Sequence, residues 1–314
     1  MKFIWSHLAY HNFTPAKNGS HRRRAIFAHG LFNQVDTLLL CSQFTKLLER
    51  ELVVSGFYID YKHRKSVPLS KIIDLSSLPV KTHDWMKNIE KQVQLSSVGN
   101  FYIVPPYDVK EMLDIIKKTE NNHDHLEVGC CFNLQLRNND FVVDHRNLRF
   151  HPIFYNIVAD FSRHHHRYQV IHYRMETDFS AYFYNYGGNG FQDEKTYRKY
   201  LFDQFHSLIR EKFDPNIPTL VVSGYYKEKV RDFDLVFPNL IHFRLSNEQD
   251  RMLCNHLKIA FSYPKREIHG ILDFLLAVNP RVSKFIGIDG STFSQAVSRH
   301  NPSNSFFIQT YLKR

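Results

Sequence analysis

The sequence is poor in cysteine and has no long hydrophobic run. Its 314 residues include four cysteines, whose uneven spacing offers neither a disulfide framework nor the C-x-x-C pattern of a zinc site: Cys41, Cys130, Cys131 and Cys254. No segment approaches the ~18 continuous apolar residues of a transmembrane helix, and the first residues lack the apolar core of a signal peptide. We therefore expect a soluble protein of a reducing compartment, either cytoplasmic or from a virus or microbe.

Positive charge is in excess. Forty-one Lys and Arg residues face 31 Asp and Glu residues, which gives a net charge of +10, with 19 His besides. Such a balance suits nucleic acids, membrane surfaces or phosphorylated small molecules without choosing among them. The sequence has no basic amphipathic helix and no RNP-like aromatic motif, which argues against nucleic acid. Apolar residues make up 43% and aromatic residues 15%, enough for a packed core and incompatible with a disordered chain.

Strand and helix patterns alternate through both halves of the chain. Residues 25–29 predict a first strand, followed by a turn at Gly30, a helix over 35–50 and a second strand over 52–59. This βαβ order implies a parallel sheet. Further strands are expected over 101–104, 168–173, 219–223, 242–245 and 284–288, helices over 108–118, 147–162, 194–212, 247–256, 266–278 and 292–300, and a polar, turn-rich segment over 121–140. The length suggests two domains, and we predict two facing Rossmann-like α/β domains over residues 1–160 and 161–314.

The stretch RYQVIHYRMETDFS, residues 167–180, carries the strongest chemical signal. Its β-branched and aromatic run predicts a buried strand that ends at Arg174, with Glu176 and Asp178 close behind. Arginine binds phosphate oxygens in pairs, and ligands of open α/β sheets bind beyond the carboxyl ends of the strands. The spacing alone leaves two interpretations open: a phosphate clamp, or a surface ion pair between Arg174 and one of the acids.

Two glycine turns add candidate anion sites. Gly30 stands between a predicted strand and helix, where exposed N–H groups favour phosphate. The second turn, GIDGSTFS over 287–294, offers Asp289 to a base or ribose, and Ser291 and Thr292 to phosphate or to capping. Each is also compatible with an ordinary turn or N-cap. The absence of G-x-G-x-x-G and of G-K-[ST] leaves dinucleotide binding and P-loop hydrolysis unsupported. Together with Arg174, the turns predict one nucleotide-diphosphate site.

Three blocks of the sequence resemble the plant O-fucosyltransferase-like family, which belongs with protein O-fucosyltransferases, nodulation and core fucosyltransferases, and pectin rhamnosyltransferases. HYRMETDF is similar to its H-x-R-x-E-x-D-[MF] motif. HGLFNQVDTLLLCSQFTKLLERELVV is similar to its G-G-L-N-Q turn, helix and strand, although Leu31-Phe32 replaces one residue there. ILDFLLAVNPRVSKFIGIDGSTFSQAVSRH is similar to its late segment. The blocks follow the family's order and span most of the chain. The resemblance implies a GT-B fold and inverting, metal-independent transfer from a nucleotide sugar, with no cofactor.

The resemblance also implies roles for individual residues. Arg174 would bind the β-phosphate and stabilise the leaving diphosphate. The general base would be His29, where some relatives place a glutamate, because histidine titrates near neutrality. The competing interpretation is that His29 is structural, and some relatives have no evident base. The residues expected to bind substrate or to support Arg174 are Gly30, Phe32, Asn33, Gln34, His172, Glu176, Asp178, Asp289, Gly290, Ser291, Thr292 and Phe293.

Two further patterns have the composition of metal sites, the D-x-D of Asp232 and Asp234 and the run His164 to His166. We interpret the first as a chance match in a charged loop and the second as a polar loop, and predict no metal site. The leading hypothesis is a fucosyltransferase that moves fucose from GDP-fucose to a glycan or protein hydroxyl. The alternatives are a related transferase with a rhamnose or xylose donor, and a non-catalytic protein that binds glycans or nucleic acid.

Overall fold

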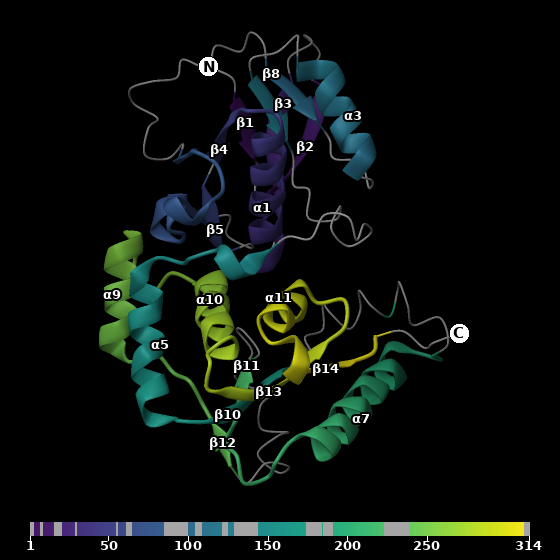
Figure 1. Cartoon of the computed structure of the whole chain (residues 1–314), viewed down its shortest axis with the longest axis vertical. Helices are drawn as coiled ribbons and strands as arrows, with labels where there is room; N and C mark the ends of the chain where they lie inside the picture. The colour runs from purple at the N-terminus through teal and green to yellow at the C-terminus, as the bar shows by residue number, and fades with distance from the viewer. Residues whose placement is uncertain are drawn as a thin grey trace. The chain divides into compact units, whose positions relative to one another are not determined.

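The computed structural model forms two compact units (Figure 1). The first comprises Met1–Pro152 and Arg251–Ile268, and the second Ile153–Asp250 and His269–Arg314. The description below concerns the residues that the structure describes, which are 3–6, 9–15, 21–28, 30–54, 56–60, 65–84, 100–103, 109–120, 125–128, 144–173, 184, 191–222 and 239–310.

The first unit is built on a five-stranded sheet. Its strands lie in the order β7-β4-β1-β9-β8, and all neighbours are parallel. They are β1 (Phe3–Ser6), β4 (Glu51–Val54), β7 (Thr82–Asp84), β8 (Asn100–Ile103) and β9 (His125–Val128). Parallel strands need crossover connections, and helix α1 (Leu31–Leu47) packs on β1 and β4, with Val35, Leu38 and Phe44 fully buried. The predicted parallel sheet is therefore present.

The prediction that residues 25–29 form the first strand of this parallel sheet is wrong. Residues 25–28 lie in β3 (His21–Ala28), which pairs antiparallel with β2 (Ala9–Pro15) in a separate two-stranded sheet. The strand that precedes α1 in the parallel sheet is β1 instead, because the hairpin is inserted between β1 and the helix. A strand in a hairpin and a strand in a parallel sheet carry the same local β propensity, so the pattern of residues 25–29 does not distinguish them.

The expected strand over residues 52–59 is interrupted. β4 ends at Val54, and Gly56 has a φ of 120°, a left-handed conformation that ends the extended run before β5 (Phe57–Asp60). β5 pairs antiparallel with β6 (Lys65–Val67) outside the main sheet. The segment expected to be polar and turn-rich contains β9, which is paired on both sides, with β1 and β8.

Shorter elements complete the first unit. They are the helix α3 (Val109–Glu120), which packs on β8, and the 3-10 turns η1 (Leu69–Lys71), η2 (Leu75–Ser77) and η3 (His145–Asn147). The helix expected over 147–162 begins at Pro152 as α5 (Pro152–His164), which belongs to the second unit from Ile153 onward. Proline at the first helical position fits because its fixed φ suits the helix and it needs no N–H partner there.

The first unit also includes a later segment of the chain, residues 251–268. It includes most of α9 (Asn247–Leu257) and the start of α10 (Arg266–Ala277). His256 Nε2 donates to the main-chain oxygen of Lys71 at 2.7 Å, and its ring lies 4.1 Å from that of His151. Burial lowers the pKa of His256, which favours the neutral ring in this contact. The units thus divide the chain differently from the expected boundary at residue 160.

The second unit has a five-stranded sheet in the order β12-β11-β10-β13-β14, with all neighbours parallel. The strands are β10 (Tyr168–His172), β11 (Thr219–Val222), β12 (Leu240–Ile241), β13 (Val282–Ile288) and β14 (Ser305–Ile308). The chain starts in the middle, builds outwards through β11 and β12, and then returns to the other side of β10. This is the strand order of a Rossmann domain, and it reverses between β10 and β13.

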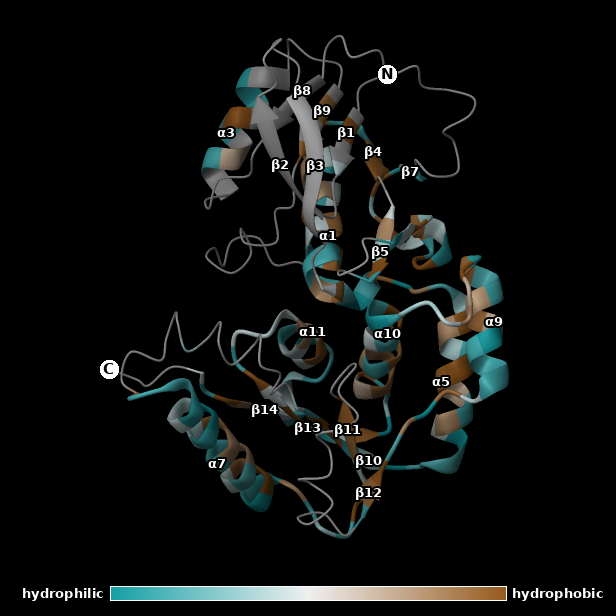
Figure 2. Cartoon of the chain, turned by 180° about the vertical axis from the view of Figure 1, so that it is seen from behind, coloured by the Kyte–Doolittle hydropathy of each residue, from teal (hydrophilic) through white to brown (hydrophobic). Residues whose placement is uncertain are grey.

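Helices and a buried cluster support this sheet. α7 (Glu194–Lys212) begins at Asp193, whose side chain accepts from the N–H of Thr196 at 2.7 Å. It packs on β13 and β14 through Tyr197, Leu201 and Phe205. Figure 2 shows the strands β10 and β11 in brown and α7 with both teal and brown residues, as expected for a helix with one buried face. α11 (Thr292–His300) packs on β13 and is followed by η5 (Pro302–Asn304).

The helices over 194–212 and 292–300 begin and end where the sequence predicts, while the strand expected over 242–245 is wrong. β12 lies earlier, at Leu240–Ile241, because only those residues pair with β11. In the parts of the chain that the structure describes, no helix is both long and apolar enough to cross a membrane.

A buried glutamine offers a test of the second unit's core. Gln169 has no exposed surface; its Nε2 donates to the main-chain oxygen of Asp214 at 2.9 Å, and its Oε1 accepts from the N–H of Asp214 at 2.8 Å. Gln204 clamps the backbone of Gln309 in the same way near the surface, at 3.1 and 3.2 Å. We expect Gln169→Met to lower the free energy of unfolding by about 2 kcal/mol, because a buried N–H loses its partner.

Gln204→Met is the matched control. Water can replace the lost amide there, so we expect a loss of about 0.5 kcal/mol or less. Urea unfolding of both variants measures the difference, and equal losses would contradict the importance that we assign to burial.

Candidate active site at the edge of the second sheet

The carboxyl ends of β10 and β13 define the candidate site. These two strands are neighbours, and the strand order of the sheet reverses between them. In open α/β sheets the loops diverge at such a point and leave room for a ligand beyond the strand ends. Two groups of predicted site residues lie here, His172 at the end of β10 and Asp289 to Phe293 after β13. Tertiary structure therefore brings together residues that are more than 100 positions apart in the sequence.

His172 is the last residue of β10 and is held rigidly. Its side chain is buried, and its Nδ1 lies 2.7 Å from the Oγ of Ser294. Its ring also lies 4.3 Å from the ring of Phe293, with 35° between the planes. The Oγ of Ser294 accepts from the N–H of Ile288 at 3.1 Å, so a single hydroxyl connects the two strand ends. The imidazole is thereby fixed at the base of the candidate site.

The turn after β13 shapes the other side. Gly290 has a φ of 78°, which few side chains tolerate, and its N–H donates to the Oδ1 of Asp289 at 2.8 Å. Asp289 itself is exposed, while its N–H donates to the main-chain oxygen of Ile308 at 3.0 Å. The backbone of the turn is therefore anchored to β14, and its carboxylate lies at the surface.

Helix α11 starts at this turn. The Oγ of Ser291 accepts from the N–H of Ser294 at 3.5 Å, as an N-cap residue does. The first turn of an α-helix carries N–H groups outside the intrahelical ladder, and the first turn of α11 begins at Thr292. The positive end of the helix dipole also lies here. Backbone donors and dipole together make this edge suited to an anion such as phosphate.

Close packing of α11 against β13 depends on Gly287. A Cβ added to this glycine would lie 2.6 Å from the Oγ of Ser294 and 2.7 Å from the Cε1 of Phe285. Such distances are well inside van der Waals contact, so only glycine allows the helix to approach this far. The approach places Ser294 within hydrogen-bond reach of His172. Ser294 was not among the predicted site residues, although its spacing of three from Ser291 is a recognisable capping signal.

The predicted residues of the first unit form a different arrangement. Gly30 is exposed and is the N-cap of α1, with no side-chain capping bond, and Asn33 is partly exposed. Phe32 and Gln34 are buried, although both were predicted to contact substrate. Phe32 packs edge-on against the ring of His145 at 5.6 Å.

Gln34 acts within the fold of the first unit. Its Nε2 donates to the main-chain oxygen of Tyr58 at 3.0 Å, and its Oε1 accepts from the N–H of Tyr58 at 2.9 Å, so that it holds β5 against α1. Two residues further along α1, the buried Asp36 lies 2.6 Å from the Nε2 of His145. The N-Q-x-D pattern of this block therefore has a structural role in the first unit.

A further carboxylate that sequence analysis missed lies at the Gly30 turn. The N–H of Leu31 donates to the Oε2 of Glu267 at 2.5 Å, and Glu267 is buried. No local pattern signals this contact, because the two residues are 236 positions apart in the chain. The remaining predicted site residues, His29, Arg174, Glu176 and Asp178, lie outside the described residues, as do Asp232 and Asp234.

The histidine run before β10 shows no metal-binding geometry. His164 Nδ1 donates to the main-chain oxygen of Asp160 at 3.0 Å, and the ring of His165 lies 4.4 Å from that of Phe161. Burial and the nearby His164 lower the pKa of His165. Within the described ranges, no group of three or more His, Cys, Asp or Glu side chains could hold a metal ion.

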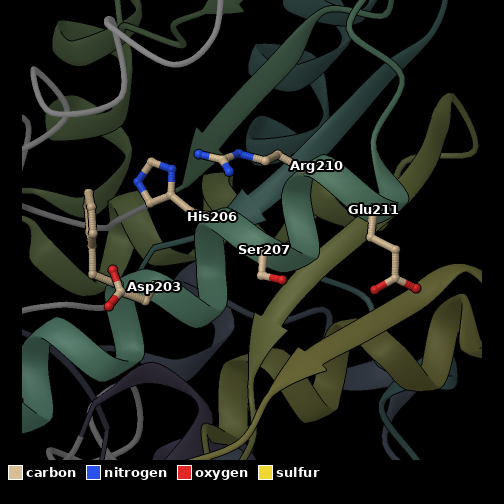
Figure 3. A pocket seen from close by; sticks show the side chains of 6 residues that line it. Asp203, His206, Ser207, Arg210 and Glu211 are labelled. Atoms are coloured by element: carbon tan, nitrogen blue, oxygen red, sulfur yellow. The ribbon is translucent and has the colours of Figure 1, made fainter.

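Hollows elsewhere in the second unit contain none of the predicted site residues. One, of about 740 Å³, lies along α7 and is lined by Phe202, Asp203, His206, Ser207, Arg210 and Glu211 (Figure 3). Burial and the nearby Arg210 lower the pKa of His206 there. A smaller one, of about 300 Å³, is lined by residues of α5 and of the segment after β12. The candidate site is therefore assigned to the carboxyl ends of β10 and β13, beside the N-terminus of α11.

Comparison with known proteins supports the fold. No family model and no curated protein sequence matches the chain. Among solved structures it is similar to POFUT1 in complex with GDP-fucose, with 14% identity, a TM-score of 0.62 and coverage of 98% of each chain. It is also similar to the NodZ α-1,6-fucosyltransferase soaked with GDP-fucose, with 9% identity, a TM-score of 0.55 and coverage of 96% of this chain and 93% of that one. NodZ from Bradyrhizobium gives 11% identity and a TM-score of 0.52 over 94% of this chain and 91% of that one.

The chain has the GT-B fold of these fucosyltransferases. The predicted fold class is therefore confirmed. At 9 to 14% identity the likeness establishes architecture, and the role of each residue depends on the geometry of the site itself.

Substitution of Gly287 tests the close approach of α11. We expect Gly287→Ala to lower the free energy of unfolding by about 1–3 kcal/mol, because the added methyl group overpacks the contact with Ser294 and Phe285. The control is Gly270→Ala inside α10, where alanine is the better helix former by up to ~1 kcal/mol. Urea unfolding compares the two, and a Gly287 variant as stable as the control would refute the packing argument.

Proposed function

We propose that this protein is a glycosyltransferase, specifically a fucosyltransferase that moves fucose from GDP-fucose to a hydroxyl of a glycan or protein. The observation that carries the proposal is the edge where β10 and β13 end at the reversal of strand order, with the first turn of α11 beside them. Solved structures of the same fold are of fucosyltransferases with GDP-fucose or GDP. The fold and the local chemistry therefore point to the same class of ligand.

The diphosphate is bound by the α11 terminus and Arg174 in this proposal. Tyr173 is buried and continues the pairing of β10, with its N–H donating to the main-chain oxygen of Val222 at 3.0 Å. Arg174 is the next residue in the sequence, and we propose that its guanidinium acts at this edge. A guanidinium and a helix N-terminus both stabilise the negative charge that develops on the leaving GDP. Positive charge from the protein's own groups is the reason to propose a metal-independent reaction.

The neighbouring residues have supporting roles. Gly290 and Ser291 shape and cap the turn beside the phosphates, the hydroxyl of Thr292 contacts them, and the exposed Asp289 and the ring of Phe293 contact the nucleoside. Glu176 and Asp178 orient the guanidinium of Arg174. His172 is buried and bonded to Ser294, so we assign it to supporting this edge rather than to proton transfer.

The transfer is a single displacement with inversion. The acceptor oxygen forms a bond to the anomeric carbon while the bond from that carbon to the diphosphate oxygen breaks, and its electron pair leaves with GDP. The general base takes the proton of the acceptor hydroxyl, and we assign this role to His29, which precedes the exposed Gly30 in the sequence. The first unit provides the acceptor side, and the second unit binds the nucleotide sugar.

Nucleotide binding tests this function directly. We expect GDP to raise the melting temperature and UDP to leave it unchanged, because a ligand that binds only the folded state stabilises it. A panel of GDP- and UDP-sugars separates fucose from rhamnose and xylose donors. No stabilisation by any nucleotide would reject the glycosyltransferase function and favour a binding protein.

Arg174 provides the catalytic test. We expect Arg174→Ala to reduce GDP-fucose turnover by roughly 10²–10³-fold, the loss typical of a group that stabilises transition-state charge. Arg174→Lys should remain impaired, because lysine lacks the bidentate fork. Arg210→Ala on α7 is the control and should leave turnover unchanged. Full activity of Arg174→Ala would exclude its proposed role.

Metal dependence is the third test. With the leaving charge neutralised by Arg174 and α11, turnover should stay within about twofold when EDTA is added. Loss of activity in EDTA and its recovery with Mn²⁺ would contradict this mechanism and favour a metal site at Asp232 and Asp234.

A further inference from the structure

The N-terminus of α1 is already bound to a carboxylate of the same chain. The Oε2 of Glu267 lies 2.5 Å from the N atom of Leu31, and it is 3.9 Å from the position that a Cβ on Gly30 would take. Glu267 is only 5% exposed, whereas Gly30 is exposed. The acid therefore lies beneath the glycine turn, on its inner side.

The local sequence explains why a distant acid is needed. α1 is 17 residues long and starts at Gly30, which has no capping side chain, and its first turn contains no acidic residue. Its N–H groups and dipole nevertheless favour a negative charge. The chain supplies that charge from the first turn of α10, in the segment 251–268 that belongs to the first unit.

The segment 251–268, which contains Glu267, is held by further hydrogen bonds. The Nζ of Lys265, which is buried, donates to the main-chain oxygens of Phe261 at 2.9 Å and Tyr263 at 3.2 Å. Earlier in the same segment, His256 is bonded to Lys71. His256 therefore ties the segment to the first unit, and Lys265 stabilises the turn that precedes α10, so the position of Glu267 is specified.

We propose that Glu267 is a positioning residue for the Gly30 turn, and that it makes the α1 terminus unavailable to the donor's diphosphate. This inference rests on the proposed glycosyltransferase function. A phosphate at the N–H of Leu31 would have to displace a buried carboxylate or lie against it, and like charges at such distances repel. The diphosphate is then bound by the α11 terminus and Arg174 alone. The bond from Leu31 to Glu267 fixes the Gly30 turn, which then orients the neighbouring groups toward the acceptor.

Two substitutions separate positioning from folding. Glu267→Gln keeps an oxygen that accepts from Leu31 but removes the charge, and Glu267→Ala removes both. Glu248→Ala is the matched control, because Glu248 also lies in the first turn of a helix, α9, but is exposed. The measurements are the Kd for GDP by calorimetry, kcat and KM for GDP-fucose turnover, and the melting temperature.

We expect Glu267→Ala to reduce kcat at least about tenfold while the Kd for GDP stays within about twofold. Loss of the carboxylate should disorder the α1 turn in this variant without affecting the donor site. Glu267→Gln should restore kcat to within about threefold of the wild type, and Glu248→Ala should behave like the wild type. A purely structural role would lower the melting temperature and the fraction of protein that binds GDP, without this separation of kcat from Kd.

Each contrary result has a distinct meaning. A tenfold change in the GDP Kd of Glu267→Ala or Glu267→Gln would show that the α1 terminus takes part in donor binding and would overturn this inference alone. An unchanged kcat in Glu267→Ala would do the same. A wild-type protein that binds GDP neither in calorimetry nor in thermal shift would overturn the proposed function, and this inference with it.

Discussion

The contact between Gly287 and Ser294 is the constraint on which the candidate site depends. Because residue 287 lacks a Cβ, α11 lies close enough to β13 for the Oγ of Ser294 to bond to both Ile288 and His172. That single hydroxyl joins the ends of two strands that are more than 100 residues apart in sequence. The same approach places the first turn of α11 at the reversal of strand order, where a Rossmann sheet binds its ligand. The position of the α11 terminus at this edge thus follows from a packing requirement.

The second organising feature is the return of residues 251–268 to the first unit. Chain connectivity would leave this segment with the second half, but its polar contacts tie it to the first, through His256 with Lys71 and Glu267 with Leu31. A division of the chain at one point therefore misses part of the first unit. The segment also carries the acid that occupies the α1 terminus, so the distribution of charge at the Gly30 turn depends on it.

Much of the second unit was predictable because its signals are local. α7 begins at Asp193, which caps it, and α11 begins at Ser291, so both helices start where the sequence predicts. β10 is buried on both faces, as a central parallel strand is. The first unit was less predictable. A hairpin of β2 and β3 precedes α1, and the strand pattern of residues 25–28 is identical whether the strand joins the hairpin or the parallel sheet.

By itself, the sequence determined the α/β class, the bounds of the well-capped helices and the presence of chemical groups suited to a nucleotide diphosphate, since periodicity, capping and residue type are local properties. Tertiary structure decided which groups meet. In the first unit Gln34 bonds to Tyr58, Phe32 packs on His145, and Leu31 bonds to Glu267. In the second unit His172 bonds to Ser294. Those outcomes depend on strand order and on side-chain packing between distant segments, and the sequence carries no local signal for either.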